Sequence, residues 1–254
     1  MSGHSKWAKI KHAKAGADAK RGKIFSKFAK EIMILAKAGG GDPATNAALR
    51  NMLAKAKASN MPNDNIERAI KKGTGEGASV NFEEITYEGY AAGGIGLVVK
   101  VLTENKNRSA AEVGNIFKKN NSDFAKIGSV SRNFERKGKI VIDAEGRSED
   151  DVMTIALDAG ADDMVTEEDS FVIYTTQQAF ADVCDALAKA GIETTEAEVG
   201  LIPTATKTIS DVAVAKQVQR FIDALEDYDD VQDVYSDMVL DPAVEEALAA
   251  EEEE

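Results

Sequence analysis

The chain has 254 residues and a formal net charge of −13 at pH 7, and it is 43% hydrophobic and 30% charged. A chain of this length and composition forms roughly two domains with a sizeable core. Its single cysteine, Cys184, excludes an internal disulfide framework and a cysteine-based zinc site, and its apolar neighbours favour a buried side chain. Because no signal-peptide pattern or membrane-length apolar run occurs, we expect a cytoplasmic protein without membrane contact.

Charge is distributed very unevenly along the chain. Residues 1–72 carry 16 lysines and arginines against five acids, a net charge of +11. Residues 73–139 have a net charge of +2, and residues 140–254 have a net charge of −26. This asymmetry predicts a polyanion-binding end and a solvated, self-repelling acidic end.

Residues 1–22 form the most basic segment, and their large apolar side chains are limited to Trp7 and Ile10. Such a segment cannot offset its own ordering entropy, so we expect a mobile basic arm that becomes ordered when it binds a partner. Trp7 lies between two lysines and is placed either to stack on an unpaired base, which would favour RNA, or to anchor the arm on the rest of the protein.

A helical period begins at Lys23 and predicts a three-helix unit over residues 23–72. At 100° per residue, apolar and basic side chains fall on opposite faces of the first helix. The apolar stripe consists of Phe25, Phe28, Ile32 and Leu35, and the basic face of Lys23, Lys27, Lys30 and Lys37. Glycines 39–41 end this helix, Asp42-Pro43 is expected to begin the second, and Asp64 to cap the third, which ends at Gly73. The N-terminal helical domain with its linker then covers 23–79.

From residue 80 the pattern changes to strands and helices in alternation. Strands are predicted at 85–88, 97–102 and 129–134, with a helix capped by Ser109 and running to Lys119. The following order is βαββαβ, with strands at 139–143, 162–166, 171–175 and 193–199 and helices at 149–159 and 178–190, which is typical of a ferredoxin-like domain. A helix at 211–226 and a strand at 231–239 would complete the earlier sheet.

These elements predict an α+β protein of three domains, in which one ferredoxin-like α/β domain is inserted in another. The boundaries are 80–135 plus 205–242 for the outer α/β domain, 136–204 for the inserted domain, and 243–254 for a solvated acidic tail.

Several motifs resemble those of the YebC/PmpR family in identity and order. They include Gly3-His4-Ser5-Lys6-Trp7, Gly40-Gly41-Asp42-Pro43, Met61-Pro62, Asn65-Ile66-Glu67-Arg68-Ala69-Ile70, Tyr87-Glu88-Gly89-Tyr90 and Gly128-Ser129-Val130. Two stretches depart from the family pattern, at 103–109 and at 120–126. The resemblance implies three domains, no catalysis and no metal. It also implies a regulator of gene expression, since family members are described as DNA-binding transcriptional regulators or linked to translation and the ribosome.

We therefore predict nucleic-acid contacts from three regions of the chain, because dense lysines and arginines neutralise phosphates. The arm contributes Lys6, Trp7, Lys9, Lys11, Lys14, Lys20 and Arg21, the helical unit Lys23, Lys27, Lys30, Arg50, Lys55 and Lys57, and the α/β part Lys106, Arg108, Arg132, Arg136 and Lys137. Lys106 and Arg108 are expected in a loop before a capped helix, where backbone N–H groups and cations hold a phosphate together. The alternative is that these side chains are only solvated or cap their helices.

The sequence leaves the type of nucleic acid open between duplex DNA and ribosomal RNA, because phosphate contacts carry no sequence or sugar information. No enzyme, cofactor or metal is predicted, since His4 and His12 lack partners at ligand spacing and Gly73-Thr74-Gly75 follows a helix rather than a strand. A monomer is favoured. A small-molecule sensor or a protein-binding adaptor that uses the acidic α/β domains is the alternative function.

Overall fold

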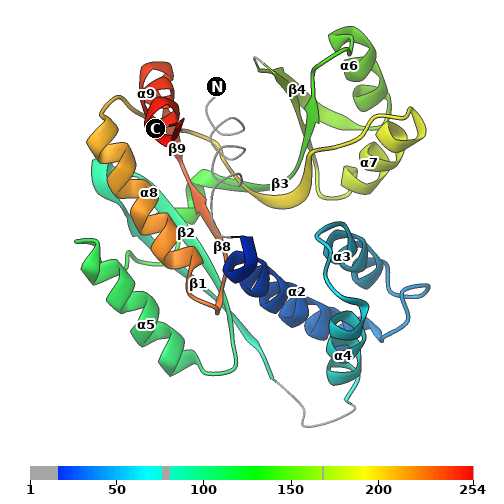
Figure 1. Cartoon of the computed structure of the whole chain (residues 1–254), viewed down its shortest axis with the longest axis horizontal. Helices are drawn as coiled ribbons and strands as arrows, with labels where there is room; N and C mark the ends of the chain where they lie inside the picture. The colour runs from blue at the N-terminus through cyan, green and yellow to red at the C-terminus, as the bar shows by residue number, and fades with distance from the viewer. Residues whose placement is uncertain (1–16, 76–80, 168, 254) are drawn as a thin grey trace.

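The computed structural model describes residues 17–75, 81–167 and 169–253 of the chain. Figure 1 shows a helical unit, in blue and cyan, beside two sheets that carry helices. This is the α+β architecture predicted from the sequence. Most of the predicted basic arm lies outside the described residues, and its last six residues, from Ala17 on, already belong to the first helix.

The helical unit packs three helices around one apolar core. The predicted stripe is confirmed, because Ile32, Leu49 and Ala56 are fully buried and Phe25 and Phe28 pack against them. The helices are α2 (Ala17–Gly39), α3 (Ala47–Ala58) and α4 (Asn63–Gly73).

A buried asparagine fixes the turn between α2 and α3, and the prediction that Asp42 begins α3 is wrong. Asn46 is the N-cap, and its side-chain oxygen accepts a hydrogen bond from the Leu49 N–H at 3.0 Å. The amide nitrogen of Asn46 donates to the carbonyls of Leu35, at 2.8 Å, and Gly40, at 2.9 Å. One side chain thus satisfies backbone groups at the end of one helix and the start of the next.

Two other helix starts also differ from the prediction. Asp64 lies in the first turn of α4, which follows Pro62 and has no side-chain cap. The helix after β2 begins at Lys106 with Asn105 as its N-cap, so Ser109 lies inside the helix and is buried. In both cases the predicted cap belongs to the first turn instead. Pro62 already sets the start of α4, and the polar residue Asn105 sets the start of the helix after β2.

The first sheet has three antiparallel strands in the order β1-β2-β8. Two helices, α5 and α8, lie side by side across it (Figure 1), and Phe117 of α5 contacts Phe221 of α8 edge to face. A short parallel pair, β7-β9, joins the same core. The elements are β1 (Glu83–Tyr90), the 3-10 turn η1 (Ala92–Gly94), β2 (Gly96–Thr103), α5 (Lys106–Lys119), β7 (Lys207–Ile209), α8 (Val212–Glu226), β8 (Val231–Ser236) and β9 (Met238–Leu240).

The second sheet has four antiparallel strands in the order β4-β5-β3-β6, with α6 and α7 packed on its core. This βαββαβ order and strand arrangement are ferredoxin-like, as predicted. The segment lies in the chain between β2 and β8, which are neighbours in the first sheet, so it is inserted there. The numerical domain boundaries given above stay predictions. The elements are β3 (Phe134–Asp143), α6 (Glu149–Asp158), β4 (Ala161–Thr166), β5 (Ser170–Thr175), α7 (Phe180–Lys189) and β6 (Glu196–Pro203).

The strand predicted at 129–134 is wrong, because residues Ser131–Asn133 form the 3-10 turn η2 and β3 begins only at Phe134. The N–H groups of Val130 and Ser131 donate to the buried carboxylate of Glu88, so they are not available for a strand ladder. The first sheet therefore lacks the extra strand that the sequence suggested.

The C-terminal segment is also different from the prediction of a solvated tail. Residues Pro242–Glu253 form α9, and Val244 and Leu248 are buried in the core of the first sheet. The predicted strand at 231–239 is divided at Asp237, whose carboxylate accepts a hydrogen bond from the Gly96 N–H at 2.8 Å. Within the described ranges, no helix combines the length and the apolar character that crossing a bilayer requires.

Candidate nucleic-acid interface

Three of the four lysines on the basic face of α2, Lys23, Lys27 and Lys30, contact the segment 227–232 of the outer α/β domain. The fourth, Lys37, donates a hydrogen bond to the side-chain oxygen of Asn81. The Lys23 ammonium is 2.8 Å from the Asp227 carboxylate, and Lys27 donates to the Gln232 carbonyl at 3.2 Å. These two lysines, predicted to contact phosphates, are therefore engaged with acceptors of their own chain. The pattern of the helix placed them on one face correctly but could not show what covers that face.

Lys30 makes the most buried of these contacts, an ion pair with the carboxylate of Asp230. The Lys30 and Asp230 side chains are 15% and 7% exposed, and their charged atoms are 2.7 Å apart. Besides the Lys30 ammonium, the donors to this carboxylate are the guanidinium of Arg108 and the hydroxyls of Thr103, Ser109 and Tyr228. Asp230 thus joins α2 to the end of β2 and the start of α5.

The surroundings of Asp230 favour its ionised form. Burial by itself raises the pKa of the carboxyl group, but the hydrogen bonds from Lys30, Ser109 and Arg108 outweigh it and hold the pKa well below its ordinary range. A buried carboxylate with this many donors serves to hold these elements together. We name the contacts of Lys23, Lys27 and Lys30 with 227–232 the α2 latch.

Lys106 and Arg108 lie in the first turn of α5 rather than in a preceding loop, which corrects the prediction for this pair. Both side chains are exposed, and the Arg108 guanidinium lies 3.1 Å from the Asp230 carboxylate. A phosphate held by both side chains would have to compete with Asp230 for Arg108.

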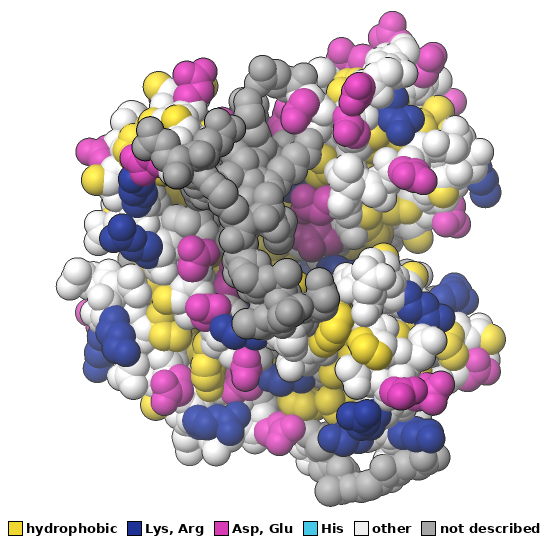
Figure 2. All heavy atoms as spheres, viewed as in Figure 1, with side chains coloured by type: hydrophobic (Ala, Val, Ile, Leu, Met, Phe, Trp, Pro, Cys, Tyr) yellow, Lys and Arg dark blue, Asp and Glu magenta, His cyan; other side chains and the backbone are white. Residues whose placement is uncertain are grey.

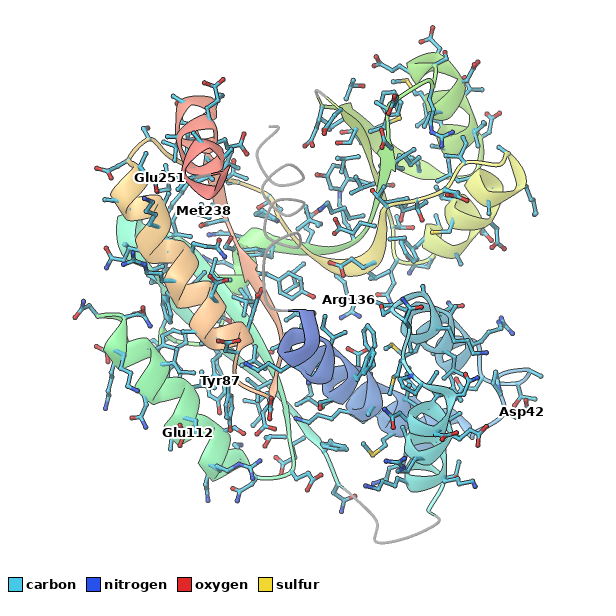
Figure 3. The ribbon with its side chains drawn as sticks, in the orientation of Figure 1. Asp42, Tyr87, Glu112, Arg136, Met238 and Glu251 are labelled. Atoms are coloured by element: carbon cyan, nitrogen blue, oxygen red, sulfur yellow. The ribbon has the colours of Figure 1, made fainter. Side chains whose placement is uncertain are left out.

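Of the other cations predicted for the α/β part, Arg136 and Lys137 lie on β3 and Arg132 on the preceding turn η2. Side chains alternate along a strand, so Lys137 and Arg136 point to opposite faces. Lys137 lies 3.4 Å from Glu135 and 4.0 Å from Asp162. Arg136 is exposed where β3 faces α2 and α3 (Figure 3), close enough to Tyr235 to affect its pKa. Arg132 is exposed on η2.

The exposed cations of the helical unit gather on α3 and α4. Arg50 and Lys57 are about 20° apart around α3, while Lys55 points to the other side of that helix, towards Glu198 at 3.6 Å. On α4 the basic side chains lie opposite the buried Ile66 and Ala69. We name the exposed set the outer basic face, and it consists of Arg50, Lys57, Arg68, Lys71 and Lys72.

Figure 2 shows dark-blue side chains, with some magenta ones among them, along the edge formed by α3 and α4, while the upper lobe formed by the inserted domain is mainly magenta among its charges. Within the described part of the chain, none of the five cations forms an ion pair, and Arg50 only approaches the Pro43 carbonyl at 3.4 Å. Sequence reasoning missed the α4 members Arg68, Lys71 and Lys72. Their common side of the helix was readable from the same 100° period that identified the α2 lysines.

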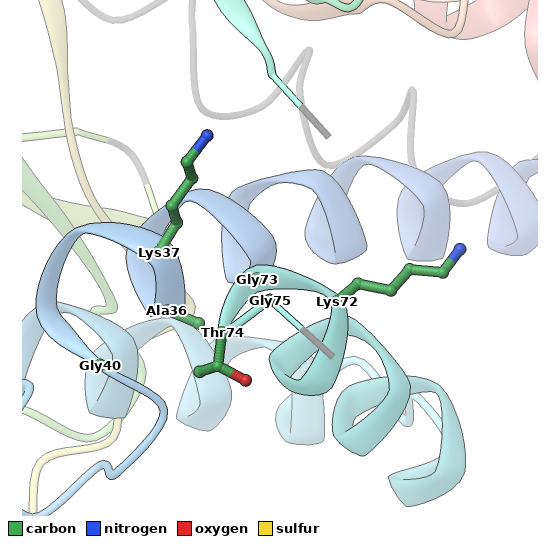
Figure 4. Close-up of a pocket in the computed structure, with 7 residues that line it drawn as sticks. All are labelled: Ala36, Lys37, Gly40, Lys72, Gly73, Thr74 and Gly75. Atoms are coloured by element: carbon green, nitrogen blue, oxygen red, sulfur yellow. The ribbon is translucent and has the colours of Figure 1, made fainter. Parts of the chain in front are cut away.

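The glycine-rich end of α4 borders a hollow of about 400 Å³, shown in Figure 4. Lys37 and Lys72 flank it, but their side chains point away from each other and from Thr74. The carbonyl ends of α2 and α4 also meet here, which disfavours an anion. The hollow therefore gathers no converging donors for a phosphate, in agreement with a linker role for this segment.

Three carboxylates lie close together where α2, β6 and β8 meet. Burial, followed by the charges of Asp233 and Glu198, raises the pKa of Glu31, against the lowering effect of Lys55 and Lys27. Burial is also the largest cause that raises the pKa of Glu198. This acidic junction makes the inner side of the helical unit a poor surface for a polyanion, in contrast to its outer side.

Within the described ranges, no group of three or more His, Cys, Asp or Glu side chains is arranged so that it could hold a metal ion. Cys184 packs half-buried beside the core of the inserted domain, and burial followed by the charge of Asp185 raises its thiol pKa to about 11. Such a thiol is inert at neutral pH.

The fold and its exposed cations define a modular α+β protein that presents a basic helical face. Comparison with models of known protein families identifies the family. The model of the TACO1/YebC protein N-terminal domain matches residues 5–76, and the model of the TACO1/YebC second and third domain matches residues 82–238. The chain belongs to the TACO1/YebC family.

Several relatives are similar over nearly their whole length. A probable transcriptional regulatory protein of Treponema denticola is 53% identical over 94% of this chain and 96% of its own length. One of Halothermothrix orenii is 45% identical over 99% of this chain and 100% of its own length. Among solved structures, a conserved hypothetical protein of Aquifex aeolicus superposes with a TM-score of 0.82 at 41% identity, over 93% of this chain and 98% of that one.

Proposed function

We propose that this protein is a non-enzymatic regulator of gene expression that binds nucleic acid through the outer basic face. The observation that carries the proposal is the position of Arg50, Lys57, Arg68, Lys71 and Lys72, which are exposed on two packed helices and form no ion pair within the described ranges. Cations that are not already held in ion pairs can neutralise phosphates at low cost.

The distribution of charge supports the same orientation. The acidic inserted domain and the carboxylates of the α2–β6–β8 junction would repel a polyanion from the inner side, so the nucleic acid approaches the outer edge of α3 and α4. The names of the relatives, probable transcriptional regulatory proteins, agree with a regulatory role. We further propose that the protein acts in the cytoplasm as a monomer, with duplex DNA or ribosomal RNA as its target.

The test compares co-sedimentation with ribosomes and binding to promoter DNA at about physiological salt. It uses the full chain and an Arg50→Glu/Lys57→Glu variant. We expect the wild-type chain to bind one of the two targets with steep salt dependence, and the variant to lose about tenfold or more in affinity. Lys189→Glu, an exposed reversal on α7, is the matched control and should bind as the wild type does.

The outcome also separates the alternatives. Binding to ribosomes alone assigns the protein to translation, and binding to promoter DNA alone assigns it to transcription. No affinity for either target, together with a saturable increase in melting temperature by a small molecule, would overturn the proposal in favour of a ligand sensor.

A further inference from the structure

The loop between α5 and β3 exposes an isoleucine almost completely. Ile127 is 88% exposed, and beside it in the loop Phe124 is 42% exposed. Leu157 on α6, another exposed large apolar residue, is 47% exposed. Single exposed apolar residues are common on protein surfaces, so the exposure of Ile127 indicates a binding role only if its loop is held in a fixed conformation.

A buried carboxylate holds the loop directly after Ile127. Glu88 is 2% exposed and accepts hydrogen bonds from the N–H groups of Gly128 at 2.8 Å, Val130 at 2.7 Å and Ser131 at 3.1 Å, and from the Ser131 hydroxyl at 2.7 Å. Burial raises the pKa of Glu88, but these hydrogen bonds outweigh it and lower the pKa overall, so the carboxylate stays ionised. Four donors to one ionised group fix the backbone of residues 128–131.

The other side of the loop is fixed by packing and by backbone pairing. The Phe124 ring stacks on Tyr87, with centroids 4.7 Å apart, and contacts Phe117 at 4.9 Å. The Ala125 N–H donates to the Glu88 carbonyl at 2.7 Å, so the same residue tethers both sides of the loop. Ile127 is therefore displayed at the tip of a loop anchored at both ends, rather than on a loose segment.

The chain on both sides of this tip is basic. Lys118 and Lys119 end α5, Lys126 precedes Ile127, and Arg132 follows on η2, and all four are exposed. Asp123 is the one acid between residues 118 and 132. Charge complementarity therefore favours a polyanion as the partner of the tip, and a protein surface of mixed charge would gain less from it.

We propose that this tip is a second nucleic-acid contact, in which Ile127 inserts at an unpaired or bulged base while the surrounding cations hold the flanking phosphates. Apolar side chains inserted between base steps are a general means by which proteins open a stack, and an unpaired base offers the least resistance. The inference rests on the proposed function, because it adds a contact on the α/β part to the binding by the outer basic face.

The experiment uses the full chain and an RNA hairpin with a single bulged 2-aminopurine, whose fluorescence rises when the base leaves the stack. We expect wild-type protein to raise the fluorescence on binding. Ile127→Ser should abolish that rise and weaken binding about tenfold. The slope of affinity against salt should stay unchanged, because no charge is removed. Lys126→Ser should instead lower the slope by about one.

Two controls keep the result specific. Leu157→Ser removes an exposed apolar side chain from the inserted domain and should behave as the wild type, and a fully paired hairpin should bind Ile127→Ser and wild-type protein equally. Unchanged affinity and fluorescence with Ile127→Ser would overturn the inference and leave a protein partner for the tip. If the wild-type chain binds neither hairpin, the contact proposed for the tip is overturned, whereas the proposed function fails only if ribosomes and promoter DNA are not bound either.

Discussion

Lys30 on α2 and Arg50 on α3 belong to the same basic helical unit, but their surroundings differ. The Lys30 side chain is 15% exposed and bonded to Asp230, whereas Arg50 is exposed on the outer side of α3. The first cation holds the helical unit to the outer α/β domain, and the second is available to a partner. A high density of lysines in a sequence therefore does not tell which of them bind a ligand; the acids that the fold brings to each of them decide it.

Replacing Asp230 should have the largest effect on the latched side. Asp230→Ala leaves Lys30 and the hydroxyls of Thr103 and Ser109 without their acceptor in a buried place, so we expect a loss of about 3–5 kcal/mol in the free energy of unfolding. Urea denaturation followed by circular dichroism measures it. Asp227→Ala breaks only the exposed pair with Lys23 and should cost less than about 1 kcal/mol. Equal losses for the two variants would contradict the distinction between the two contacts.

The same carboxylate predicts how the latch depends on pH. Because the folded-state pKa of Asp230 lies below its ordinary value of 3.8, its contribution is fully present above that value and is lost as the pH falls below it. Unfolding free energies measured between pH 6 and pH 3 should decrease more steeply for the wild type than for Asp230→Asn, which cannot titrate. Parallel profiles for the two proteins would show that Asp230 is not bonded as described.

A smaller effect of opposite sign is expected at Glu31, on the same helix as the latch. Its folded-state pKa is raised above the ordinary value of 4.5, mainly by burial, so the ionised form destabilises the folded protein at neutral pH. Glu31→Gln should therefore raise the melting temperature at pH 7, and the gain should disappear as the pH falls below about 4.5. A lower melting temperature at pH 7 would mean that Lys27 and Lys55 stabilise this carboxylate more than burial disfavours it.

Much of the fold could be predicted because it rests on local periodicity. The apolar stripe of Phe25, Phe28 and Ile32 and the βαββαβ order of 134–203 both follow from side-chain patterns of period 3.6 or two. The helix starts at Asn46 and Asn105 were missed, since several neighbouring polar residues can cap a helix and tertiary contacts select one. The tail at 243–254 was misjudged because its acids hide Val244 and Leu248.

The site was harder to predict than the fold. Asp227 and Asp230 meet the lysines of α2 from about 200 positions away in the sequence, and no local pattern indicates such a pairing. The cations of α4 were missed although the sequence contained the information, because the same helical period shows that Arg68, Lys71 and Lys72 share a side of the helix. Residues 1–16 lie outside the described residues, so the nucleic-acid contacts predicted for them stay predictions.

The most direct test removes the same number of charges from each side of the helical unit and measures affinity for one RNA hairpin and one DNA duplex. Arg50→Ser/Lys57→Ser should weaken binding about tenfold or more and lower the slope of affinity against salt by about two. Lys23→Ser/Lys27→Ser should change affinity less than about twofold, because Asp227 and the Gln232 carbonyl already engage these lysines. Circular dichroism confirms that both variants are folded. A larger loss from the α2 pair than from the α3 pair would contradict the account.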